Sequence, residues 1–221
     1  MIKAPSETPF SAMALAHLCE KVGFPKGVVN VVTAAKGEKE AAVGKTLCEH
    51  KDVRKISFTG STPVGKLLMS QSASTLKKLS FELGGNAPFI VFGDADLDKA
   101  VEGAIACKFR GSGQTCVCAN RIYVHESVYA EFASKLASKV DKFKLGNGME
   151  EGVTHGPLVS ERGLEKVKEH VEKSVKAGAK VLVGGEAGEG LFFEPTVLSE
   201  VTADCVSAGE CAYSHFGTLR C

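Results

Sequence analysis

Residues 53–81 read VRKISFTGSTPVGKLLMSQSASTLKKLSF, and this stretch predicts a strand, a helix and a second strand in that order. The first strand covers 53–59, and Gly60-Ser61 separates it from a helix that begins near Thr62. The second strand covers 77–81. Strands joined through a helix by short loops form βαβ units, which build a parallel sheet with right-handed crossovers.

The same alternation extends in both directions along the chain. Further strands are predicted at 28–33, 89–92, 120–125, 181–183 and 192–198, and further helices at 38–50, after Asp96, around 128–140 and around 164–175. The strand at 28–33 is rich in valine and is expected to be buried. A first helix from Pro9 has one apolar face, formed by Phe10, Met13, Ala14, Leu18 and Val22.

The composition is that of a folded protein without a strong charge bias. The chain has 221 residues, of which 44% are hydrophobic and 24% charged, and its net charge is +1. These values exclude intrinsic disorder and argue against a nucleic-acid partner, which usually requires a basic excess. No apolar run approaches the roughly 18 residues of a membrane span, so no membrane partner is expected.

The eight cysteines are too few for a disulfide scaffold in a chain of this length. The residues after Met1 do not resemble a secretory signal, so free thiols in a reducing compartment are expected, in the cytoplasm or the mitochondrial matrix. No metal site is predicted, because the only clustered candidates match no zinc spacing: Cys205, Cys211, His215 and Cys221.

Cys116 is the first candidate for chemistry, within the sequence GQTCVC of residues 113–118. A nucleophilic cysteine must be partly exposed and stabilised as a thiolate. A glycine nearby lets the backbone approach a substrate closely and direct N–H groups at a developing oxyanion. The alternative is a small thiol buried beside a loop.

Glu82 and Gly60-Ser61 both follow predicted strands. In α/β proteins the carboxyl ends of the strands face the ligand-binding crevice, so Glu82 could act as a general base through a water molecule. The free N–H groups after Gly60-Ser61 suit a phosphate. The alternatives are a solvated charge at the strand end and an ordinary helix N-cap.

Three further polar residues are candidates for binding. Lys3 and Ser6 precede the first helix, where a lysine can hold ribose hydroxyls or a phosphate, although it can also be a plain surface lysine. Arg110 lies six residues before Cys116 and could bind a carboxylate through two parallel hydrogen bonds from its guanidinium group. Arg110 could equally be a cation that interacts with the C-terminal end of a helix.

Two motifs in this order and spacing resemble those of the aldehyde dehydrogenase superfamily. They are ELGGNAP at 82–88 and GQTC at 113–116, with FTGS at 58–61 upstream. The branch most similar to this sequence is that of the succinate-semialdehyde dehydrogenases, on the evidence of TPFSA at 8–12, NAPFIVF at 86–92, KFR at 108–110 and CVCANR at 116–121. The resemblance extends from Lys3 to about Ala203.

The resemblance implies an α/β fold of the aldehyde-dehydrogenase type, with a partial Rossmann-type cofactor domain and a partial α/β catalytic domain. Residues 1–82 would form the C-terminal half of the NAD(P)-binding domain. Residues 83–203 would form an incomplete catalytic domain that carries the nucleophile, and 204–221 a divergent tail. The implied activity is the oxidation of succinate semialdehyde to succinate with NAD or NADP, in the degradation of γ-aminobutyrate.

The family's roles can be assigned to matching positions of this sequence. Cys116 would attack the aldehyde, and Glu82 would activate the water that hydrolyses the resulting thioester. Arg110 would bind the distal carboxylate of the small aldehyde substrate. Cys118 resembles a second cysteine that can form a reversible disulfide with the nucleophile, in a small and strained ring.

The cofactor would contact a second group of residues. Lys3 and Ser6 would hold the adenosine ribose or its 2′-phosphate, and the short Ser6 side chain leaves room for NADP. Gly60-Ser61 would lie at the pyrophosphate, and Leu83 beside the nicotinamide.

Two alternatives to this activity are open, and departures from the family pattern support the first of them. Members of the family are more than twice as long, form homo-oligomers through strands not found here, and use an upstream asparagine to complete the oxyanion hole. Downstream, the family's Glu-Thr-Phe-Gly-Pro motif is not matched, so no role is assigned to Glu210. One alternative is therefore a catalytically incomplete, non-enzymatic fragment; the other is a thiol redox module built on Cys116 and Cys118.

Overall fold

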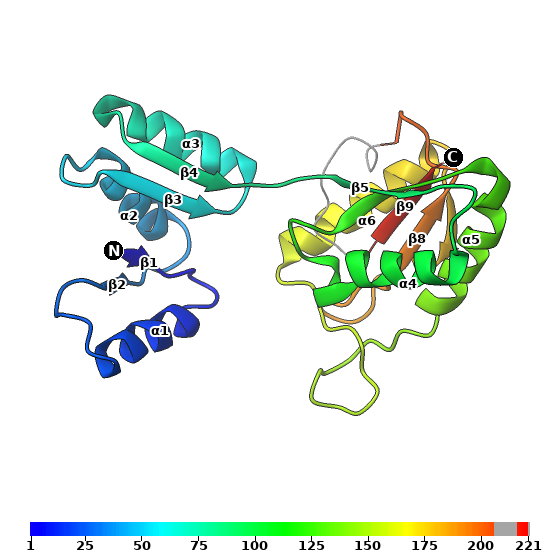
Figure 1. Cartoon of the computed structure of the whole chain (residues 1–221), viewed down its shortest axis with the longest axis horizontal. Coiled ribbons are helices and arrows are strands. Elements are labelled where there is room, and N and C mark those ends of the chain that lie inside the picture. Colours follow the sequence, from blue (N-terminus) through cyan, green and yellow to red (C-terminus); the bar gives the residue numbers. More distant parts are fainter. Residues whose placement is uncertain (206–215, 221) are drawn as a thin grey trace. The chain divides into compact units, whose positions relative to one another are not determined.

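The computed structural model describes residues 1–205 and the strand 216–220, and divides the chain into two compact units, Met1–Leu83 and Gly84–Cys221. Figure 1 shows their elements in sequence colours. Each unit contains strands and helices in alternation, as the sequence predicts. The assignment of a cofactor-binding role to the first unit and a catalytic role to the second stays a prediction.

The first unit contains two pairs of parallel strands. Strand β1 (Ile2–Lys3) pairs with β2 (Val31–Val32), and β3 (Lys55–Thr59) pairs with β4 (Lys78–Glu82). The helices are α1 (Phe10–Lys21), α2 (Glu38–Glu49) and α3 (Thr62–Ser72), followed by the short helix η1 (Ala73–Thr75). The βαβ unit predicted from residues 53–81 is confirmed as β3, α3 and β4.

Two elements of the first unit are less buried than their apolar residues suggest, and the expectation of a buried strand at 28–33 is wrong. Helix α1 forms as predicted, but none of its residues is buried, and Phe10 is 80% exposed. No described element covers its apolar face. The predicted buried strand at 28–33 is reduced to the two half-buried residues of β2, with Val28 exposed outside it. A pattern of apolar residues indicates whether a segment forms a helix or a strand, but its burial requires another element to pack against.

The second unit is built on one five-stranded sheet with the order β5–β6–β9–β8–β7. Its strands are β5 (Ala87–Val91), β6 (Ala119–Val124), β7 (Lys180–Val183), β8 (Thr196–Ser199) and β9 (Phe216–Arg220). All neighbours pair in parallel except β7, which is antiparallel to β8. The sheet therefore combines crossover connections with one hairpin-like edge.

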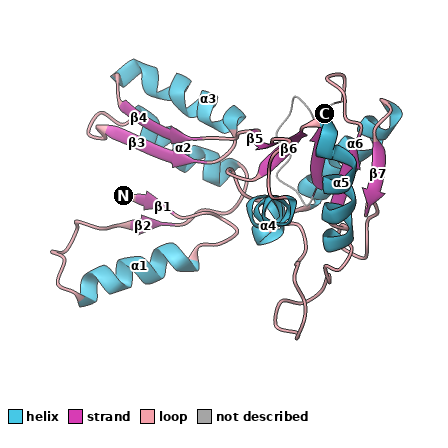
Figure 2. Ribbon diagram, turned by 45° about the vertical axis from the view of Figure 1, so that its right-hand side comes forward, coloured by secondary structure: helices cyan, strands magenta, loops and turns pink. Residues whose placement is uncertain are grey.

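Helices cover both faces of this sheet (Figure 2). Helices α4 (Leu97–Lys108) and α5 (Glu126–Val140) contribute to one hydrophobic core, which also contains Val197 of β8. Helix α6 (Glu161–Lys176) contributes to a second core, which contains the next residue, Leu198. Since neighbouring residues of a strand point to opposite faces, the two cores lie on opposite sides of the sheet.

Strand β9 lies within residues 204–221, where the sequence predicts no strand. It lies between β6 and β8 and pairs in parallel with both. Leu219, buried in the first core, is the register partner of Ile122. Residues 216–220 read FGTLR, and their two apolar residues are three positions apart, so no alternating or continuous apolar run indicates a strand there. The strand is specified by its two neighbours. Four residues that the sequence analysis considered without assigning them a role lie outside the described residues: Glu210, Cys211, His215 and Cys221.

Candidate active-site residues

Cys116 lies in the segment 109–118, between helix α4 and strand β6. The segment contains a short turn of helix, η2 (Arg110–Gly113), in which three successive residues have positive φ: Gly111 at 58°, Ser112 at 57° and Gly113 at 69°. Ser112 is a non-glycine residue in the left-handed region, a conformation that costs free energy and is held by its surroundings. The backbone is therefore tightly constrained three residues before Cys116.

Hydrogen bonds to residues 155–159 supply that constraint. The Gln114 amide Nε2 donates to the Pro157 carbonyl at 3.3 Å, and its Oε1 accepts from Val159 N at 2.9 Å. Gly156 N donates to Ser112 Oγ at 3.3 Å. The side chain of Gln114, in the GQTC motif, thus fixes the backbone that leads into Cys116.

His155 holds the beginning of the same segment. Its Nε2 lies 3.1 Å from the Phe109 carbonyl oxygen and its Nδ1 2.9 Å from Thr154 Oγ1. The ring is stacked on Phe143 with centroids 4.3 Å apart. Burial lowers the pKa of His155, more than the hydrogen bond to Phe109 raises it, so the ring is neutral and Nε2–H is the donor to Phe109.

A buried lysine links the helix before this segment to the strand after it. Lys108 ends α4, is fully buried, and donates from Nζ to Asn120 Oδ1 of β6 at 2.7 Å. Sequence analysis missed both Lys108 and His155 as supporting residues. The KFR sequence at 108–110 was noted only for its resemblance to the family, and nothing in these three residues indicates that Lys108 is buried.

The two cysteines of the motif have different environments. Cys116 is exposed, which excludes the buried-thiol alternative for it, whereas Cys118 is buried. The Cys118 thiol lies 2.6 Å from Thr115 Oγ1, and Cys118 N donates to the Thr115 carbonyl at 3.3 Å. Gly85 packs against the same turn, since a Cβ there would lie 3.6 Å from the Cys116 carbonyl oxygen. Cys116 therefore has the accessibility that a nucleophile needs.

Arg110 is exposed and forms no ion pair with an acidic side chain among the described residues. It lies two residues after Lys108, the last residue of α4, and follows the C-cap residue Phe109. Both interpretations of Arg110, a helix-end cation and a carboxylate-binding group, are compatible with this position.

In the first unit, Glu82 and Gly60 meet at the carboxyl ends of β3 and β4. Gly60 N donates to the Glu82 carbonyl at 3.0 Å, and the Glu82 side chain is exposed. Ser61 is the N-cap of α3 in an extended conformation, and its side chain makes no capping hydrogen bond. N–H groups in the first turn of α3 therefore have no side-chain acceptor and suit an anion.

Leu83 lies over the same helix. A Cβ on Gly65 of α3 would come within 2.6 Å of Leu83 Cδ2, so the absence of a side chain at position 65 makes room for Leu83. The structure thus brings together three of the residues predicted to contact the cofactor, Gly60, Ser61 and Leu83, around one end of α3.

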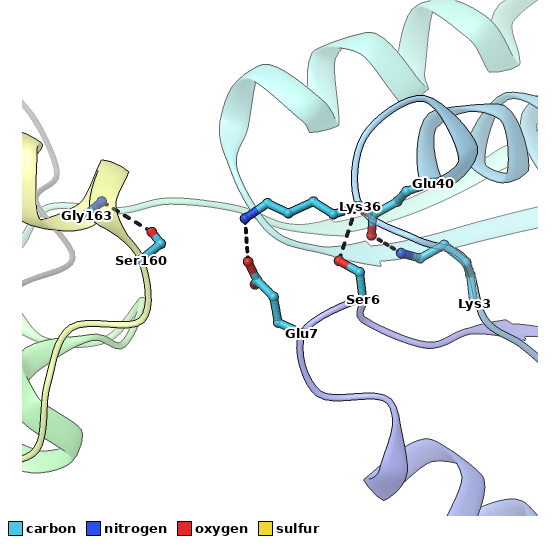
Figure 3. A network of polar contacts seen from close by, with 7 residues as sticks. All are labelled: Lys3, Ser6, Glu7, Lys36, Glu40, Ser160 and Gly163. Atoms are coloured by element: carbon cyan, nitrogen blue, oxygen red, sulfur yellow. Dashed lines mark hydrogen bonds and ion pairs between the residues drawn. The ribbon is translucent and has the colours of Figure 1, made fainter. Parts of the chain in front are cut away.

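Lys3 and Ser6 belong to a polar network that sequence analysis did not predict (Figure 3). Lys3 forms an ion pair with Glu40 in the first turn of α2, and Ser6 Oγ donates to Glu40 Oε2 at 3.4 Å. Beside it, Lys36 Nζ lies 2.6 Å from Glu7 Oε1. No local sequence signal connects Glu40 with Lys3, because 37 residues separate them.

These residues fit a dinucleotide cofactor in the chemistry of their donors. The first turn of α3 offers N–H groups to an anion, and Lys3 and Ser6 offer donors at the end of a parallel strand. No metal site is indicated: among the described residues, no three His, Cys, Asp or Glu side chains cluster as ligands. In the same part of the chain, no helix is long and apolar enough to cross a membrane.

The α/β architecture and these motifs are typical of one class of protein. Comparison with known sequences identifies that class. The model of the aldehyde dehydrogenase family matches residues 1–210, so the chain belongs to that family. It is 56% identical to the glutarate-semialdehyde dehydrogenase of Pseudomonas putida, an alignment that covers 95% of this chain and 43% of the relative. It is 55% identical to the succinate-semialdehyde dehydrogenase [NADP(+)] GabD of Escherichia coli, over 92% of this chain and 42% of the relative.

A solved structure gives the same result for the fold. The crystal structure of succinate-semialdehyde dehydrogenase from Burkholderia pseudomallei matches with a TM-score of 0.94 and 51% identity. The match covers all of this chain and 45% of that one. The predicted aldehyde-dehydrogenase fold is thereby confirmed, and the chain spans less than half the length of the relatives it matches.

Proposed function

We propose that this chain carries the nucleophile of an NAD(P)-dependent dehydrogenase that oxidises a small aldehyde with an anionic group at its far end. The observation that carries the proposal is the exposed Cys116 on a constrained turn. The relatives named above act on succinate or glutarate semialdehyde by name, and both compounds carry a terminal carboxylate. Succinate semialdehyde, an intermediate of γ-aminobutyrate degradation, is the substrate we favour.

Cys116 attacks the aldehyde carbon through Sγ and forms a thiohemiacetal. NAD or NADP, when bound, supplies the acceptor for the hydride. The oxidised adduct is a thioester on Cys116, and water hydrolyses it to the acid and the free thiol. The hydrogen bonds of Gln114 and Ser112 to residues 156–159 fix the backbone from which Sγ acts.

Glu82 and Arg110 are given the two remaining chemical roles. The exposed Glu82 carboxylate accepts the proton of the hydrolytic water. Arg110, which forms no ion pair with an acidic side chain among the described residues, binds the distal carboxylate of the substrate through its guanidinium group. The one-carbon difference between the relatives' substrates does not change this recognition, since both keep the same terminal anion.

The cofactor roles are assigned within the first unit. The N–H groups at the start of α3, after Gly60-Ser61, bind the pyrophosphate, and Lys3 and Ser6 bind the adenosine ribose. Leu83, held over Gly65, packs beside the nicotinamide.

Cys118 is proposed as a redox partner of Cys116, which would form a disulfide with it by exchange with an external disulfide that is reduced to two thiols. Its buried thiol must first leave Thr115 Oγ1, because the two atoms are 2.6 Å apart. Oxidation would therefore break a contact within the same turn that presents the nucleophile.

The test is aldehyde-dependent formation of reduced nicotinamide by the purified chain, with succinate semialdehyde and NAD or NADP. Cys116→Ser should abolish the absorbance change. Cys107→Ser is the matched control, because Cys107 is also an exposed cysteine but lies on α4, and it should retain the activity. If the wild-type chain forms no reduced nicotinamide, or if both substitutions reduce the rate equally, the proposal is wrong.

A further inference from the structure

Glu40 engages both residues to which we assign the adenosine ribose. Lys3 forms an ion pair with its carboxylate, and Ser6 Oγ donates to the second oxygen at 3.4 Å. The Lys3 and Glu40 side chains are only 21% and 32% exposed, so this pair is less screened by water than a typical surface pair. Figure 3 shows the two side chains pointing toward each other from β1 and α2.

The charges of this network balance without any ligand. Lys3 and Glu40 form one pair, and Lys36 and Glu7 form the other. A ribose that ends in hydroxyl groups brings no charge to this site, and a carboxylate can accept hydrogen bonds from those hydroxyls. A 2′-phosphate brings about two negative charges, and it must compete with Glu40 for Lys3 and Ser6.

We infer that Glu40 is a specificity-determining residue, which disfavours a 2′-phosphate on the nucleotide that Lys3 and Ser6 hold. The inference rests on the proposed function, because it assumes that these residues bind the adenosine ribose. Like charges brought together at a binding site weaken association, and the carboxylate of Glu40 remains beside the phosphate even after Lys3 changes partner. The short side chain of Ser6 leaves space for the 2′-phosphate, but the negative charge of Glu40 repels it.

The test compares the dissociation constants of NAD and NADP by titration calorimetry on the full chain. Glu40→Gln keeps the size and the acceptor oxygen of the side chain but removes its charge. The ratio of the NADP to the NAD dissociation constant should fall by about tenfold, the effect expected for removal of one repulsive contact. Glu38→Gln is the matched control: it removes the same charge from the same turn of α2, at an exposed position. It should change the ratio by less than about twofold, as for a surface charge screened by salt.

Two results would overturn the inference in distinguishable ways. In the first, both nucleotides bind, but Glu40→Gln changes the ratio of the NADP to the NAD dissociation constant no more than Glu38→Gln does. Glu40 then does not determine specificity, and the cofactor role of Lys3 and Ser6 stands. If neither NAD nor NADP binds to the wild-type chain or to either variant, the cofactor role assigned to Lys3 and Ser6 fails together with the inference.

Discussion

His155 shows how one buried side chain can stabilise the segment that leads to the exposed Cys116. The neutral ring donates from Nε2 to the Phe109 carbonyl and accepts at Nδ1 from Thr154 Oγ1. Its stacking on Phe143 excludes water from one face of the ring. Protonation would place a charge in this buried setting and would remove the acceptor at Nδ1.

The lowered pKa of His155 predicts a loss of stability in mild acid. The unfolded chain protonates this histidine near its ordinary value of 6.5, whereas the folded chain does so only at lower pH, because burial disfavours the charged ring. The contribution of His155 is therefore fully present above pH 6.5, and is lost as the pH falls from there through the folded-state pKa. Within that window the free energy of unfolding should fall by up to about 1.4 kcal/mol per pH unit on account of this residue.

Urea unfolding at several pH values between 7.5 and 5 would measure this effect. His155→Gln removes the titrating group and should flatten the pH dependence relative to wild type. His125→Gln is the control, because His125 is exposed at the N-cap of α5. An equal flattening by both substitutions would show that the pH dependence does not arise from burial of His155.

At the level of elements, α1 and α5 both contain apolar residues at helical spacing but have different surroundings. Helix α1 has no buried residue, and Leu18 is 53% exposed. Helix α5 packs on the sheet of the second unit, where Leu136 is fully buried in the first core. The contribution of each leucine to stability depends on this difference, since the hydrophobic effect scales with the area removed from water.

Leu136→Ala should therefore lower the free energy of unfolding by about 2–5 kcal/mol, and Leu18→Ala should change it by less than about 0.5 kcal/mol. The two substitutions remove the same atoms from two helices, so each is the control for the other. Urea unfolding followed by circular dichroism measures both. A large loss from Leu18→Ala would mean that α1 buries its apolar face in solution.

At the scale of the whole molecule, the two units differ in how much of each is buried. The fully buried apolar residues of the first unit are Ala4 and Cys48 among the described residues. The second unit has two hydrophobic cores, on opposite faces of its sheet. Local stability follows the density of buried apolar contacts, so the units should open with different free energies.

Amide hydrogen exchange should resolve this difference along the chain. Amides of β3 and β4 should exchange faster than those of β6 and β8, even though all four strands are hydrogen-bonded within sheets. Mass spectrometry of peptides from each strand gives the measurement, and the same peptides from the urea-unfolded chain give the reference rate. Equal protection in all four strands would show that the chain unfolds as one cooperative unit.

The sequence by itself determined the family, the order of the elements and the candidate residues for chemistry. Cys116, Glu82 and Gly60-Ser61 could be found because local motifs and turn chemistry are properties of short stretches. Strands and helices were predicted nearly everywhere that a periodic run was long enough to be distinguished from a loop.

The tertiary structure decided which of these elements are buried and which side chains meet. Strand β9 exists because β6 and β8 offer hydrogen-bond partners on both sides, whereas its sequence FGTLR has no apolar alternation that would predict a strand. The contacts of Glu40 with Lys3 and of His155 with Phe109 span 37 and 46 residues. Such contacts follow from the path of the whole chain, because only folding brings groups that are distant in sequence within hydrogen-bond distance.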